Sequence, residues 1–151
     1  MFFKKMIAIV LCCFSATSFA ETVQVAGPVN LILNHPVTIS IEKKVLPNPR
    51  IDYELTCIIR SPHVMNIFVN NNIDFGGRYI LLNGRPMVGN SYQAQGDLVP
   101  GTNVLQLANV FGGAVVMQQM AITNLDGGNL SAIIESCIVT QYGPAQYSDG
   151  F

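Results

Sequence analysis

The clearest hydrophobic pattern in the chain is a strict alternation over residues 51–60, IDYELTCIIR. The apolar residues at alternate positions of this run are Ile51, Tyr53, Leu55, Cys57 and Ile59. Because successive side chains of a strand point to opposite faces of a sheet, this alternation predicts a half-buried strand. A similar run at 130–141, LSAIIESCIVTQ, lies near the opposite end of the chain and carries Cys137. The two runs predict an early and a late strand of one β domain.

Turn residues divide the rest of the chain into further short strands. Gly27-Pro28 separates two apolar segments of an N-terminal arm, and a second alternating run follows at 37–45. Asn83-Gly84 lies between apolar segments and predicts a hairpin, because both residues tolerate positive φ. About eight to ten short strands, separated by turns every ~8 to 12 residues, are typical of a single antiparallel β-sandwich or jelly roll.

Residues 104–124 fit two kinds of secondary structure. Leu105 and Leu107 alternate as in a strand, whereas Val104 and Phe111 also fit helical spacing with Leu107. The neighbouring segments read as strands, and glycines interrupt the stretch. We favour strands here, with a helix as the alternative.

The first twenty residues are expected to be a secretory signal peptide. Two lysines precede an apolar run, and small residues follow it up to Ala20. The run is shorter than the ~20 residues that a membrane-spanning helix needs. The sequence thus predicts a signal peptide at 1–20, a β-sandwich domain at 21–140 and a loosely ordered tail at 141–151. The protein is expected to be exported, to the periplasm or the cell exterior.

The expected mature chain carries little charge. Without the two lysines of the signal peptide, six basic and nine acidic residues remain, and no basic cluster is longer than two lysines. Nucleic acids bind to clusters of Lys and Arg, so we expect no nucleic-acid partner. A weakly charged surface favours association. We expect other envelope or surface proteins, or further copies of this chain, as partners, with a glycan as the alternative, and no transmembrane segment in the mature chain.

Cys57 and Cys137 are the two cysteines that remain after the expected cleavage. An oxidising compartment makes a disulfide between them the expected state. Closing a loop of roughly 80 residues stabilises a fold by about 4 to 5 kcal/mol in the chain-entropy model. A reactive thiol pair more often has C-x-x-C spacing, which this chain lacks. We therefore predict a structural bridge.

Residues 82–107 contain a strand ending in Asn-Gly, then an aromatic residue, a leucine and a Pro-Gly-x-Asn turn that leads into another strand. The matching positions are Asn83, Gly84, Tyr92, Leu98, Gly101, Asn103, Val104 and Leu107. This pattern resembles galactose-binding-like jelly-roll domains, over about a fifth of the mature chain. The resemblance implies a jelly roll and, as an alternative function, carbohydrate binding. Tyr79 and Tyr92, which lie near the predicted hairpin, and Asn83 are the candidate ligand-binding residues. No binding residue of the family is carried over from outside the stretch 82–107.

The sequence contains no G-x-S-x-G, H-E-x-x-H or phosphate-loop motif. His35 and His63 each lie beside a proline in a predicted turn, which favours local structural roles. Asp52 and Glu54 share one face of the strand at 51–60 and are the carboxylate pair that a glycan-active enzyme would use. The solvated face of any strand has the same spacing, so we expect no catalytic residue and no enzyme.

Metal binding is a further alternative. The run at 117–120, together with Met65, Met87 and the two histidines, includes ligands suitable for Cu(I) in a periplasmic copper-binding protein. Methionine is also an ordinary core residue, and we favour that role. Residues 126–129, DGGN, have too few oxygen ligands for calcium, which takes about six to eight, and predict a turn. We therefore expect no metal and no cofactor. The sequence Asn129-Leu130-Ser131 is a glycosylation acceptor in hosts that glycosylate secreted proteins.

Taken together, these features predict an exported, non-enzymatic β-sandwich that acts as an interaction or structural subunit of the cell envelope. The arm at 22–34 alternates and is suited to pair with the sheet edge of another copy. A carbohydrate-binding module is the alternative function.

The expected signal peptide can be tested directly. N-terminal sequencing of the exported protein should begin at Glu21, because a small residue at position 20 is what the signal peptidase requires. Ala20→Arg should block processing, whereas Thr22→Arg, beyond the cleavage point, should leave it intact. An exported protein that retains residues 1–20 would contradict the prediction.

Overall fold

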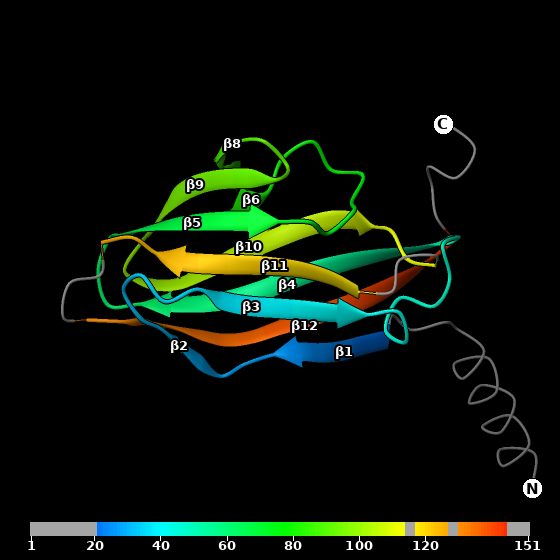
Figure 1. The fold of residues 1–151 in the computed structure, drawn as a ribbon, viewed down its shortest axis with the longest axis horizontal. Coiled ribbons are helices and arrows are strands. Elements are labelled where there is room, and N and C mark those ends of the chain that lie inside the picture. The colour runs from blue at the N-terminus through cyan, green and yellow to red at the C-terminus, as the bar shows by residue number, and fades with distance from the viewer. Residues whose placement is uncertain (1–20, 114–116, 127–129, 145–151) are drawn as a thin grey trace, which may run out of the picture.

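The computed structural model describes residues 21–113, 117–126 and 130–144. These residues form two antiparallel sheets packed face to face (Figure 1). The strands are β1 (Glu21–Ala26), β2 (Val29–Leu31), β3 (Val37–Glu42), β4 (Ile51–Ser61), β5 (Met65–Asn71), β6 (Leu81–Leu82), β7 (Arg85–Pro86), β8 (Val88–Gly89), β9 (Gln93–Leu98), β10 (Gly101–Val110), β11 (Met117–Asn124) and β12 (Ala132–Pro144). Sheet A has the order β1-β12-β4-β10-β6-β7, and β2 also pairs with β12. Sheet B has the order β3-β11-β5-β9-β8.

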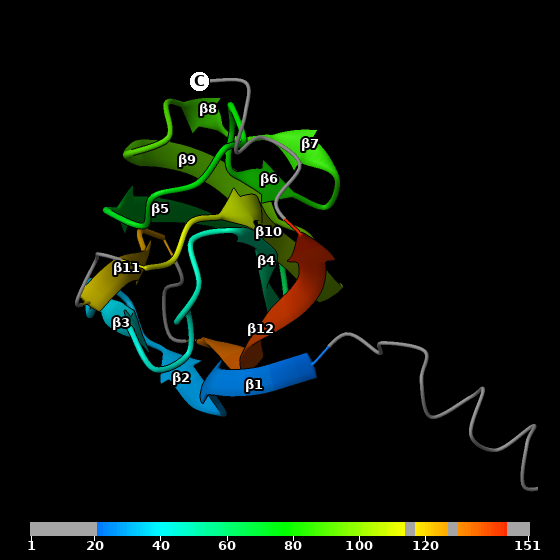
Figure 2. The same ribbon diagram turned by 90° about the vertical axis from the view of Figure 1, so that its right-hand side faces the viewer.

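The eight strands of six or more residues follow a jelly-roll order. Numbered consecutively, they run 1-8-3-6 in sheet A and 2-7-4-5 in sheet B. Figure 2 shows the two sheets facing each other, with β1, β2 and β3 together on one side of the sandwich. The predicted all-β sandwich is confirmed. The additional strands β6, β7 and β8 have two residues each, which is too short to show an alternating pattern in the sequence.

The strand predicted from the alternation is β4, at the centre of sheet A between β12 and β10. Tyr53 and Leu55 are almost fully buried against sheet B, as the alternation predicts. The opposite face is less exposed to solvent than the alternation predicts, because Asp52 is only 8% exposed and Glu54 is half-buried. The inner faces of the two sheets supply one hydrophobic core.

Cys57 and Cys137 lie opposite each other on β4 and β12 and form the predicted disulfide, with an S–S distance of 2.08 Å. Both are fully buried on the inner face of sheet A. The 80-residue separation between them spans all the strands from β5 to β11. One covalent link therefore closes a loop that contains most of sheet B.

Within residues 104–124, positions 104–110 belong to β10 and positions 117–124 form β11, so these described parts are strands and not a helix, whereas 114–116 lie outside the described residues. The run predicted at 37–45 is shorter as a strand, because β3 ends at Glu42 and the chain then turns, with the Val45 N–H donating to the Glu42 carbonyl. The asparagine run at 70–72 is typical of a loop, yet its first two residues belong to β5. Asn71 is 3% exposed and its side chain bonds to Ile73, so polar residues continue the strand here.

Two predicted boundaries differ from the structure or lie outside it. Residues 141–144 of the predicted tail belong to β12. The signal peptide at 1–20, residues 127–129 of the predicted turn with the acceptor Asn129, and residues 145–151 lie outside the described residues. The part of the chain that the structure describes holds no helix long and apolar enough to cross a membrane.

The N-terminal arm pairs with its own chain. β1 and β2 both lie along β12, separated by Gly27-Pro28. Gly27 has φ +112, and a Cβ at this position would lie 2.5 Å from the Glu135 carbonyl oxygen. Only glycine permits this close approach of the arm to β12.

Removing the disulfide should destabilise the domain. Cys57→Ser and Cys137→Ser should each lower the free energy of unfolding by about 3 to 5 kcal/mol, because each opens the same loop. The double variant should lower the free energy of unfolding by little more than either single variant does. Urea unfolding of the mature protein would measure all three. Additive effects, or two free thiols in the unreduced protein, would contradict a single structural bridge.

Candidate functional site

The three candidate ligand-binding residues have different surroundings. Tyr79 precedes β6 and is 38% exposed, with the Arg78 guanidinium carbon 5.5 Å from its ring centroid. Tyr92 lies between β8 and β9, is 67% exposed, and its carbonyl accepts a hydrogen bond from the Asn71 N–H. Asn83 begins the predicted hairpin turn with φ +53. Its side chain is held by the polar network described next.

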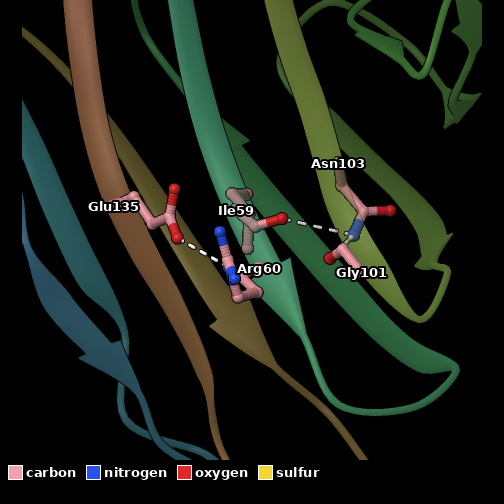
Figure 3. Close-up of polar contacts among 5 residues, drawn as sticks. All are labelled: Ile59, Arg60, Gly101, Asn103 and Glu135. Carbon is pink, nitrogen blue, oxygen red and sulfur yellow. Dashed lines mark hydrogen bonds and ion pairs between the residues drawn. The ribbon is translucent and has the colours of Figure 1, made fainter.

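Asn103 is fully buried and organises the turn between β9 and β10. Its Nδ2 donates to the carbonyls of Ile59, Val99 and Gly101, at 3.2, 2.9 and 3.2 Å. Figure 3 shows the bonds to Ile59 and Gly101. Its Oδ1 accepts from the Val99 N–H at 2.8 Å and from Asn83 Nδ2 at 2.9 Å. The network ties the β6–β7 hairpin to β4 and β10, so Asn83 and Asn103 have structural roles.

The histidines and Asp126 take part in local structure. His35 is exposed, with Nδ1 2.8 Å from the Leu33 carbonyl oxygen, and His63 is half-buried in the turn after β4. Asp126, considered above for calcium, accepts a hydrogen bond from the Asn66 N–H at 2.6 Å. Within the described ranges, no group of three or more His, Cys, Asp or Glu residues is placed to hold a metal ion.

The methionines considered for Cu(I) are mostly core residues. Met65 and Met120 are fully buried, Met87 is 5% exposed, and only Met117 of the four is exposed. Met65 and Met120 point into the sandwich from the neighbouring strands β5 and β11. Core packing therefore accounts for three of these four side chains.

Two hollows lie at the same end of sheet A, on its opposite faces. The first, the β1 groove, has a volume of about 360 Å³ on the inner side. It is lined by Glu21, Val23, Lys44, Val45, Pro47, Tyr53, Val139 and Gln141. Val139 and Tyr53 form a buried apolar floor, whereas Val23 is 44% exposed. The sandwich is therefore not sealed between β1 and the loop that follows β3.

The second, the outer hollow, has a volume of about 400 Å³. It is lined by Asp52, Tyr53, Glu54, Ala108, Asn109 and Tyr142. The structure thus brings the two sequence-predicted carboxylates together with an aromatic side chain that is 62% exposed. Tyr142 was placed in the predicted tail, so the sequence analysis missed this arrangement.

Two breaks in strand pairing shape the outer hollow. The register of β12 against β4 shifts between Gln141 and Gly143, at Tyr142. The register of β10 against β4 shifts between Leu107 and Val110, and Asn109 there has φ +54. Such bulges redirect side chains and often lie beside functional sites. Here one lies on each side of the Asp52–Glu54 stretch of β4.

A scan against models of known protein families finds no match, and a search of curated proteins finds no matching sequence.

The structural role of Asn103 can be tested by truncation. Asn103→Ala should lower the free energy of unfolding by about 2 to 4 kcal/mol, because it leaves buried backbone groups of the turn without partners. Thr102→Ala, at the exposed neighbouring position, should change it by less than about 0.5 kcal/mol. Thermal or urea unfolding would measure both. Equal, small effects would show that the network is dispensable.

Proposed function

We propose that this protein is exported and non-enzymatic, and that it acts as an interaction subunit of the cell envelope by receiving an extended segment of a partner along β1. The observation that carries this proposal is the open edge of β1 beside the β1 groove. The buried disulfide is compatible with an oxidising, extracytoplasmic compartment.

β1 offers backbone groups for pairing. It is an end strand of sheet A and, in the described part of the chain, pairs with β12 on one edge only. An unpaired edge presents a row of N–H and C=O groups, which proteins commonly protect with lysines or prolines. β1 contains neither, and Glu21 is its single charged residue. An added strand would continue sheet A by one position.

The β1 groove offers selectivity for side chains. Glu21 and Val23 line it from β1, and their partners Gln141 and Val139 line it from β12. In strand addition, main-chain hydrogen bonds supply affinity and pockets for alternate side chains supply specificity. The groove is mainly apolar, with the charges of Glu21 and Lys44 at its lining. An extended segment with alternate apolar side chains fits this surface.

Such a segment can come from an envelope protein or from a second copy of this chain. The predicted pairing of the arm at 22–34 with the sheet edge of another copy is the less direct route, because β1 and β2 already pair with β12. Leu31 of the arm is also fully buried in the core. Pairing at the outer edge of β1 leaves these contacts in place.

Val23→Lys tests the edge and the groove together. A lysine on an edge strand disfavours pairing with a further strand, while the existing pairing of β1 with β12 is kept. The substitution also places a charge in the apolar groove. Affinity capture from the native envelope fraction should lose the partner that the wild-type mature protein retains. Light scattering during size-exclusion chromatography should show whether that partner is a second copy.

The matched control is Val64→Lys, at an exposed position in the turn after β4. This turn follows the last residue of β4, whereas the β1 groove lies near the first residues of β4, at Tyr53. It should retain the partner. Capture of the same proteins by all three forms would exclude the β1 edge as the interaction surface.

A further inference from the structure

We infer that the outer hollow is a carbohydrate-binding site that takes a pyranose sugar bearing hydroxyl or amino donors and no carboxylate. The hollow faces away from the β1 groove, on the other side of sheet A, so this inference does not depend on the proposed function. It also places sugar binding away from Tyr79, Asn83 and Tyr92.

Tyr142 supplies the apolar contact. Its side chain is 62% exposed although it belongs to β12, a strand that pairs with β4 over most of its length. The register shift at this position turns it toward the Asp52–Glu54 stretch. One face of a pyranose ring carries mainly C–H groups, and these pack on an aromatic ring whose hydroxyl remains available for hydrogen bonding.

The two carboxylates supply acceptors beside that ring. Asp52 and Glu54 both line the hollow, and Asp52 is 8% exposed. Glu54 is held in place because its Oε1 accepts hydrogen bonds from Thr56 Oγ1 at 3.0 Å and from Gln106 Nε2 at 3.3 Å. Hydrogen bonds from hydroxyl or ammonium groups to an ionised carboxylate are stronger than neutral ones.

The charge of the hollow selects among sugars. Among the residues that the structure describes, its lining contains two acids and no basic residue. Arg60 shares the same face of β4 but lies six residues, about 20 Å, from Glu54. Its guanidinium is paired with Glu135 at 2.7 Å, as Figure 3 shows. A uronic or sialic acid would bring a second carboxylate beside Glu54, whose hydrogen-bond donors Thr56 and Gln106 are neutral, whereas neutral and amino sugars would not.

The remaining lining residues complete a small polar site. Asn109 contributes an amide, which can both donate and accept, from the second bulge. Ala108 leaves space between β10 and β4, and the volume of about 400 Å³ is within the range of small-molecule sites. An aromatic face, fixed acceptors and an amide thus converge from three neighbouring strands.

The test uses the mature protein and three immobilised polysaccharides: chitosan, mannan and polygalacturonate. We expect retention on chitosan or mannan and none on polygalacturonate. Tyr142→Ala should weaken retention by about tenfold or more, and Tyr142→Phe, which keeps the ring, should largely preserve it. Ala108→Leu, which fills the hollow and leaves Tyr142 in place, should also weaken retention.

The matched control is Tyr92→Ala, because Tyr92 is similarly exposed and lies outside the hollow. It should bind as the wild type does, and so should Val23→Lys, whose substitution lies on the opposite face. Unfolding curves would identify any variant that loses its fold. The inference is overturned by absence of retention on both chitosan and mannan, by preference for polygalacturonate, or by equal retention of Tyr142→Ala and Ala108→Leu with the wild type.

Discussion

The pairing of β4 with β12, covalently joined by Cys57–Cys137, is the constraint on which the rest of the molecule depends. β4 places Tyr53 and Leu55 in the core and pairs with β10 on its other edge. β12 in turn carries β1 and β2. Because the bridge spans the strands from β5 to β11, it limits the freedom of the unfolded chain while holding the centre of sheet A together.

Both candidate surfaces arise where regular pairing stops. The β1 groove lies where β1 is the last strand of sheet A and the loop after β3 does not close over it. The outer hollow lies where β10 and β12 each break register against β4. A continuous ladder satisfies its own backbone groups and leaves a regular face. Edges and bulges are therefore the positions where this sandwich can present groups to a partner.

Much of the fold was predictable because its signals are local. The alternation at 51–60 and the turn at Asn83-Gly84 each depend on a few consecutive residues, and both are confirmed as β4 and the β6–β7 hairpin. The candidate sites were less predictable. Tyr142 lies near the start of residues 141–151, which read as a tail, and Asp52 and Glu54 read as a solvated face. Nothing in their own neighbourhoods indicates that a bulge brings Tyr142 beside them.

By itself, the sequence determined the all-β class, the central strand and the disulfide, because side-chain period, turn chemistry and cysteine number are properties of short segments. Only the tertiary structure decided that residues 104–110 and 117–124 are strands, that Asp52 is buried, and that Tyr142 meets Asp52 and Glu54. The physical reason is that strand register is a property of two segments far apart in the chain. A shift of one residue changes which side chains share a face.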